Sequence, residues 1–527
     1  MKLSLLTGAP LVALTLALAA CSSDDSNGGT GGPDSSAPND AGPSSNDTGA
    51  PAPEAGSDAS DATVPPPADG GTDAAPPLAS DGGDAGPTDA GTDAAGDAGP
   101  SIQSIGHVVV LYMENHSFDN LLGTYAGAEG LASPAAEITQ LQLDGGPFAT
   151  LPQADPNVPT TLSNTPFDIS KYIPENQPTY DLVHRFYQEQ WQIHGGKMDQ
   201  FVAVSDAKGL TLGYWPTNTL PLVTFAQSIA SEVTVCDHFF HAAFGGSFLN
   251  HFWLIAARTP NFPDAGADLL VQLTADGGVA VDNQVTPDGY AINTLYTVNS
   301  PHPDGTPADQ LVPEQTYATI GDELSAAGVD WAWYAGGWYE ALGVDGGAPN
   351  PDPTFAFHHQ PFAYFAKYAD GTPGRAAHLK DETDFVAAAQ AGTLPPVSFV
   401  KPLDVYSEHP SDSVVTTSEN HAVDLINAVR NGPNWKDTVL ILTYDENGGQ
   451  WDHVPPPTTA PQADRWGPGT RVPAMVFSPF AKGGIDSTPY DTTAILALLE
   501  KRWKLAPLSP RDAAQADLGA HAMTFAP

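Results

Sequence analysis

From about residue 101 onward, apolar and largely β-branched runs alternate with amphipathic helical segments. The runs His107–Met113 and 437–444 are almost entirely apolar. Such runs are typical of strands in a parallel sheet that is covered on both faces. Further strands are predicted at 329–336, 396–402 and 471–480, and helices at 315–328, 382–392, 418–432 and 491–505. This alternation predicts an α/β fold of three α/β/α layers around a doubly wound, mostly parallel sheet.

Polar side chains follow two of these strands at the point where each one ends. Glu114 and Asn115 come directly after the first run, and Asp445 and Glu446 follow the run at 437–444. Ligands of open α/β sheets bind beyond the carboxyl ends of the strands. We therefore expect the two acidic pairs to converge. Each segment also has a simpler interpretation, because Glu114 could cap a helix and the stretch DENGGQWDH could form a hairpin turn.

A serine stands at a predicted turn-to-helix junction. Ser247 follows Gly245 and Gly246 and opens the apolar run SFLNHFWLIAA. Glycine allows close approach of a ligand to the backbone, and the first amides of a helix favour an anion. A hydroxyl placed there could attack phosphorus. The simpler alternative is that Ser247 only caps the helix.

The first 100 residues differ in composition from the rest. Residues 1–21 resemble a bacterial lipoprotein signal, with Cys21 as the lipidation site, although an ordinary secretory signal cut near Ala20 is the alternative. Residues 22–100 hold 15 acidic residues and no Lys or Arg, and few large apolar ones. They predict a disordered acidic linker, followed by a catalytic domain over 101–527. We therefore expect an exported lipoprotein of the cell envelope that touches the membrane only through its lipid anchor.

Charge and cysteine content narrow the function further. The formal net charge is −43, which argues against a nucleic-acid partner. An anionic substrate would need a local positive centre, such as a metal ion or protonated histidines, and the chain has 15 histidines. Apart from Cys21, Cys236 is the remaining cysteine, so we expect a small buried apolar residue there and no internal disulfide. We also expect a monomer.

Five stretches resemble, in order, one known family. They are ENHSFDNLLG, DLVHRFYQEQWQIHGGKMDQF, HAAFGGSFLNHFWLIAA, HHQPFAYF and LTYDENGGQWDHVPPP. Together they resemble the bacterial phosphoesterase family that contains phospholipases C and an acid phosphatase, and the resemblance runs from about Gly106 to about Leu505. It implies an alkaline-phosphatase-like fold. A serine after two glycines is more similar to the phosphatase branch than to the phospholipase branch.

The resemblance also implies roles for individual residues. Ser247 would be the nucleophile and would touch one divalent metal ion. The ion's other ligands would be Glu114, Asn115, Asp445 and Glu446. Imidazoles would hold phosphate and protonate the leaving group, with His359 and His409 the strongest candidates beside His184 and His358. Asn250 is a candidate phosphate contact. The weaker histidine candidates are His194, His238, His241, His251 and His453.

The sequence therefore favours hydrolysis of a phosphoester through a phosphoserine intermediate. The main interpretation is a phosphomonoesterase with an acid optimum, because catalysis by protonated imidazole would favour pH values below about 6.5. One alternative is a phospholipase C that cuts a phosphodiester. An alternative from another class is a non-catalytic surface protein that binds through loops on the same fold.

Overall fold

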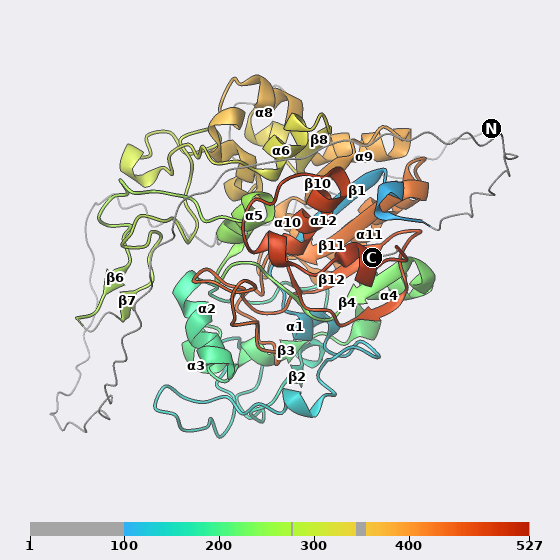
Figure 1. Cartoon of the computed structure of the whole chain (residues 1–527). Helices are drawn as coiled ribbons and strands as arrows, with labels where there is room; N and C mark the ends of the chain where they lie inside the picture. The colour runs from blue at the N-terminus through green and yellow to red at the C-terminus, as the bar shows by residue number, and fades with distance from the viewer. Residues whose placement is uncertain (1–99, 276–277, 344–354, 526–527) are drawn as a thin grey trace, which may run out of the picture. The chain divides into compact units, whose positions relative to one another are not determined.

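An eight-stranded sheet organises the part of the chain that the computed structural model describes, residues 100–275, 278–343 and 355–525 (Figure 1). Its strand order is β13-β4-β12-β11-β1-β10-β8-β9. The bounds are β1 His107–Met113, β4 Val233–Cys236, β8 Trp331–Ala335, β9 Leu379–Asp381, β10 Val397–Lys401, β11 Thr438–Tyr444, β12 Ala474–Phe477 and β13 Gly484–Asp486. Residues 1–99, with Cys21 and nearly all of the expected linker, lie outside the described residues.

Parallel pairing dominates this sheet, as the sequence predicts. Strands β11, β1, β10, β8 and β9 pair parallel in that order. The exception is β12, which is antiparallel to both β11 and β4. The register places Met113 opposite Tyr444 and Leu111 opposite Val400. The carboxyl ends of β11, β1 and β10 therefore lie side by side at one edge.

Two groups of helices pack against the sheet (Figure 1). One group consists of α4 Pro221–Ser228, α9 Glu382–Ala391 and α11 Val415–Arg430, and the other of α5 Ser247–Ala256, α6 Ile320–Ala326 and α12 Thr493–Trp503. The shorter helices are α1 Phe118–Leu122, α2 Phe186–Ile193, α3 Phe201–Val204, α7 Trp338–Ala341, α8 Pro373–His378, α10 Asp404–Ser407 and α13 Leu518–His521. Small two-stranded pairs are β2 Phe167–Asp168 with β3 Gly213–Tyr214, β5 Phe239–Phe240 with β14 Tyr490–Asp491, and β6 Gln272–Leu273 with β7 Val279–Val281.

The predicted α/β architecture is confirmed. The five predicted strands correspond to β1, β8, β10, β11 and β12, and the four predicted helices to α6, α9, α11 and α12. Strands β4, β9 and β13 were not predicted. They are only three or four residues long, which is too short for a clear periodic signal. Cys236 is fully buried in β4 as a free thiol, as expected.

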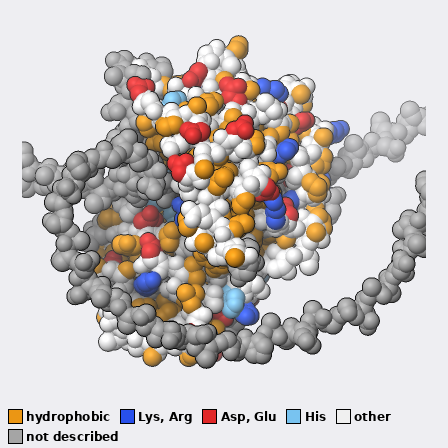
Figure 2. All heavy atoms as spheres, turned by 90° about the vertical axis from the view of Figure 1, so that its left-hand side faces the viewer, with side chains coloured by type: hydrophobic (Ala, Val, Ile, Leu, Met, Phe, Trp, Pro, Cys, Tyr) orange, Lys and Arg blue, Asp and Glu red, His pale blue; other side chains and the backbone are white. Residues whose placement is uncertain are grey.

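The described surface mixes residue types. On the face drawn in Figure 2, acidic side chains are scattered among hydrophobic and uncharged ones. None of the helices described is both long enough and apolar enough to span a bilayer.

Candidate functional site

The two acidic pairs meet at the carboxyl edge of the sheet, as the sequence predicts. The backbone N–H of Asn115 donates to Asp445 Oδ1 at 3.3 Å. Asn115 adopts a left-handed conformation, with φ +63°, and its carbonyl oxygen lies 2.3 Å from where a Cβ of Gly448 would stand. Only a glycine can pass so closely beneath Asn115. The turn after β11 thus folds directly against the end of β1. It does not form a tight hairpin, because the next strand of the sheet in sequence, β12, begins only at Ala474.

Ser247 lies beside this edge at the first position of α5. Its Oγ donates to Asn115 Oδ1 at 3.2 Å, and its hydroxyl also interacts with the carboxylate of Asp445. The N-cap residue is Gly246, so the interpretation of Ser247 as a simple cap is wrong. The hydroxyl points instead at the residues that end β1 and β11.

Two glycines and a buried acid fix the turn before Ser247. Gly245 has φ +86°, and a Cβ on it would lie 2.6 Å from the backbone nitrogen of Phe186. Its N–H donates to Glu189 Oε2 at 2.7 Å. The other oxygen of Glu189 accepts from the N–H and hydroxyl of Thr470 and interacts with His241 Nε2 at 2.8 Å. Glu189 was not predicted, because it acts through the backbone and not on substrate.

Asn250 has a positioning role in this geometry. Its Oδ1 accepts from the N–H of Ala243 at 2.9 Å. Its Nδ2 donates to the carbonyl oxygens of Ala243, Gly245 and Gly246 at 2.9, 3.3 and 3.2 Å. The amide is fully buried and engaged with the turn on all sides. Its position one turn beyond Ser247 predicted a phosphate contact, whereas the structure shows both ends of the amide bonded to the turn.

Lys401 is a site residue that the sequence analysis missed. It ends β10, and its Nζ lies 2.7 Å from Glu114 Oε1 and 3.4 Å from Asp445 Oδ2. It is fully buried. The signal in the sequence was a lone lysine closing the apolar run PVSFVKP, beside two strands that end in acids.

His359 lies beside Glu114, and two further imidazoles pack against His359. His359 Nε2 is 2.5 Å from Glu114 Oε1, and its Nδ1 is 3.2 Å from Asp404 Oδ1. His251 stacks on His359 with ring centroids 5.3 Å apart, and His358 meets His359 edge-on at 4.8 Å. Burial lowers the pKa of His359 to about 4 despite the Glu114 charge. Burial also lowers the pKa values of His251 and His358 well below the usual range.

Two further imidazoles, those of His184 and His409, are partly exposed. The side chains of His184 and His409 are 12% and 13% exposed, whereas Ser247 is 5% exposed. The two rings meet edge-on with centroids 5.8 Å apart. Burial lowers the pKa of His409, but Asp412, whose Oδ2 lies 3.0 Å from Nδ1, and Asp181 outweigh this and hold it well above the usual value.

The donor set suits a hard divalent ion. Carboxylate and amide oxygens of Glu114, Asn115, Asp445 and Glu446 are the ligands that such ions prefer. Glu446 Oε1 is buried and accepts no hydrogen bond from the described residues, and burial raises the pKa of this acid to about 8. His184 Nε2 lies 3.8 Å from this oxygen, which is too long for a hydrogen bond, and a bound cation would satisfy the oxygen more closely. Glu114, His359 and Asp404 also bring one ligand atom each within 4.8 Å of one another.

A second acidic cluster is structural. Asp119, Asp452 and His453 could also approach a metal, but the buried guanidinium of Arg471 binds both carboxylates, with Nε 2.8 Å from Asp452 Oδ1. The remaining weaker candidates have local acid partners: His194 pairs with Asp199, His238 with Glu129 and Asp237, and His241 with Glu189.

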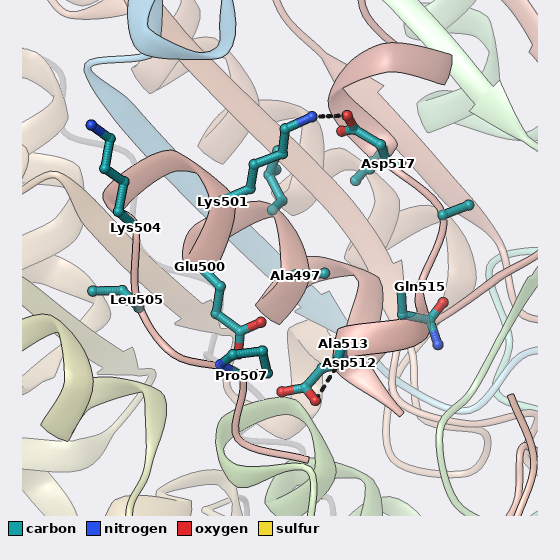
Figure 3. Close-up of a pocket in the computed structure, with 13 residues that line it drawn as sticks. Ala497, Glu500, Lys501, Lys504, Leu505, Pro507, Asp512, Ala513, Gln515 and Asp517 are labelled. Carbon is teal, nitrogen blue, oxygen red and sulfur yellow. Dashed lines mark hydrogen bonds and ion pairs between the residues drawn. The ribbon is translucent and has the colours of Figure 1, made fainter. Parts of the chain in front are cut away.

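A separate cavity of about 500 Å³ lies against α12 (Figure 3). Lys501 forms an ion pair with Asp517 at this cavity. Glu500 and Asp512 both accept from the N–H of Leu508. None of the described residues lining it is a serine, threonine, cysteine or histidine. Its described lining therefore offers no hydroxyl, thiol or imidazole nucleophile.

The phosphoesterase family model matches residues 105–506 of the chain. The chain belongs to the phosphoesterase family. It is a hydrolase of phosphoric esters, which sets aside the non-catalytic alternative. It is 27% identical to phospholipase C A of Mycobacterium tuberculosis over 77% of this chain and 75% of that protein. Identity is 26% to the non-hemolytic phospholipase C of Burkholderia pseudomallei and 25% to the hemolytic phospholipase C of Pseudomonas aeruginosa, over 76% of this chain in each case. The match covers 56% and 53%, about half, of these two longer proteins.

Among solved structures, the chain is similar to a protein in the alkaline phosphatase superfamily from Vibrio parahaemolyticus. The TM-score is 0.31 and the sequence identity 12%, over 59% of this chain and 65% of that one. The named relatives above favour the phospholipase C alternative over the phosphomonoesterase that the sequence analysis preferred.

Proposed function

We propose that this phosphoesterase is a phospholipase C type phosphodiesterase. The observation that carries the proposal is the similarity to phospholipases C along three quarters of the chain. The family model matches residues 105–506, which include Ser247, the strand-end acids and the imidazoles. The phosphodiester of a zwitterionic phospholipid also suits an acidic protein, since a strongly anionic lipid surface would repel it.

Ser247 is the proposed nucleophile. Its oxygen forms a bond to phosphorus, and the bond from phosphorus to the diacylglycerol oxygen breaks. The Ser247 proton passes to a nearby base, and the departing diacylglycerol oxygen takes a proton from His409, whose pKa is raised by the adjacent acids. Water then attacks the phosphoserine diester and gives one proton to the neutral His409. The bond from phosphorus to Ser247 Oγ breaks, the phosphorylated head group is freed, and the base returns its proton to Ser247 Oγ.

The remaining residues bind and orient. Asn115 holds the Ser247 hydroxyl, and the amides at the start of α5 face the phosphate oxygens. Glu114, Asn115, Asp445 and Glu446 would hold a divalent ion, which would supply positive charge beside the nucleophile when bound. His184 and His409 line the entrance.

The test compares the full-length protein with Ser247→Ala on two substrates after metal loading. We expect phosphatidylcholine to yield diacylglycerol and phosphocholine, measured by mass spectrometry, with little turnover of p-nitrophenyl phosphate. Ser247→Ala should lose at least about 10³-fold in kcat/KM. Release of inorganic phosphate from the monoester at a far higher rate than lipid cleavage would refute the proposal and restore the phosphatase alternative. Equal rates for both proteins would remove Ser247 from the chemistry.

A further inference from the structure

Lys401 occupies a position that family resemblance did not assign. Its ammonium lies between two carboxylates from neighbouring strands, 2.7 Å from Glu114 Oε1 and 3.4 Å from Asp445 Oδ2. The aromatic ring of Tyr112 lies beneath it, with Nζ 5.5 Å from the ring centroid. A lysine without solvent exposure is uncommon and is normally retained only where its charge is compensated.

The ammonium also lies against a second potential cation site. Glu114, His359 and Asp404 each offer one ligand atom, and these atoms lie within 4.8 Å of one another. Two carboxylates and an imidazole at that spacing could hold a divalent ion. Lys401 Nζ contacts the same Glu114 oxygen that lies 2.5 Å from His359 Nε2. A divalent ion on this oxygen would therefore stand beside the ammonium.

Charge repulsion points the same way. Glu114, Asp404, Asp445 and Glu446 carry four negative charges when ionised, and one divalent ion together with Lys401 carries three positive ones. A second divalent ion would bring the positive charge to five and would stand beside the ammonium, whose like charge would repel it.

We infer that Lys401 is a built-in monovalent cation that restricts this site to one divalent metal ion by blocking the Glu114–His359–Asp404 position. The inference rests on the metal site of the proposed function. It adds that the ammonium is a positioning residue for Glu114 and Asp445, and that its removal opens a second metal position.

The experiment counts metal ions and measures affinity in the full-length protein, with Mn²⁺ as the probe. Native mass spectrometry and isothermal titration calorimetry are applied to the wild type, Lys401→Met and the double variant Lys401→Met/Asp404→Asn. The matched control is Lys367→Met, which removes the same charge from a surface ion pair with Asp322 whose lysine is 69% exposed.

We expect one ion per chain in the wild type and in Lys367→Met. Lys401→Met should bind the first ion at least about tenfold more tightly, because a like charge is gone, and should bind a second ion that the double variant loses. Metal should also raise the unfolding temperature of Lys401→Met by more than that of the wild type. Unchanged stoichiometry and affinity in folded Lys401→Met would overturn the inference while leaving the metal site standing.

Two ions in the wild type would overturn it as well, and this measurement does not depend on the folding of a variant. Lys401→Gln provides a second neutral variant in case Lys401→Met does not fold. A wild type that binds no Mn²⁺, and no other divalent ion offered, would instead overturn the metal site of the proposed function and this inference with it.

Discussion

Gly245→Ala tests whether the turn before Ser247 is held as tightly as the structure shows. The added methyl group would meet the nitrogen and Cα of Phe186 at 2.6 and 2.7 Å and the carbonyl carbon of Arg185 at 3.0 Å. These are backbone atoms, so the neighbours cannot yield by rotating a side chain. The φ of +86° adds a second cost, because an alanine disfavours this region.

The two costs can be separated with a matched glycine. Gly371 has φ +75°, and a Cβ there would meet nothing within 4 Å, so Gly371→Ala reports backbone strain alone, about 1–2 kcal/mol. Gly245→Ala adds overpacking of about 1–3 kcal/mol. In urea unfolding, we expect the free energy of unfolding of Gly245→Ala to be lower than that of Gly371→Ala by this overpacking cost, about 1–3 kcal/mol.

Activity should separate the two variants further. Relief of the clash would move Ser247, which is two residues from Gly245, and a displacement of about 1 Å can cost about 10²-fold in rate. Gly371→Ala should keep wild-type kcat/KM. The reasoning would be refuted if the two variants lost equal stability and Gly245→Ala kept kcat/KM within about tenfold of the wild type.

Three further predictions concern charge and hydrogen bonding. In Asp412→Asn, His409 loses an acid that holds its pKa above the usual value. The alkaline limb of the kcat/KM–pH profile should therefore move to lower pH. A limb that does not move would exclude His409 as the proton donor. Asn250→Asp replaces the amide donor by a carboxylate that faces three carbonyl oxygens. We expect kcat to fall by about 10²-fold and the free energy of unfolding to fall as well. A loss of substrate affinity with an unchanged free energy of unfolding would instead indicate a phosphate contact. Burial raises the pKa of Glu419 from 4.5 to about 8, so the folded state keeps a proton that the unfolded chain releases, and the free energy of unfolding should fall as pH rises from about 4.5 to about 8. Glu419→Gln should flatten that fall in urea titrations, and a slope identical to the wild type would contradict the assignment.

The sequence predicted most of the sheet because its central strands are long and continuously apolar. The meeting of Glu114 with Asp445 followed from a general property of parallel strands, whose carboxyl ends share one edge. The antiparallel direction of β12 could not be predicted, because a short buried strand of either direction reads as the same apolar run. Direction depends on the long connection between Tyr444 and Ala474.

Side-chain roles that depend on tertiary contacts were harder to predict. Asn250 has the residue type of a phosphate ligand, yet its amide is engaged by the turn seven residues earlier. Glu189 and Asp404 were missed because their partners, the N–H of Gly245 and the ring of His359, are distant in sequence. Lys401 carried a usable signal, since a charged residue closing a buried strand must find a partner.

The depth of Ser247 sets a limit on the shape of any substrate. Ser247 is 5% exposed, and the side chains of His184 and His409 are more accessible, so the reacting phosphorus has to approach a largely buried residue. A phosphoester at the end of a flexible stem can approach such a residue more easily than one held on the rigid surface of a folded protein.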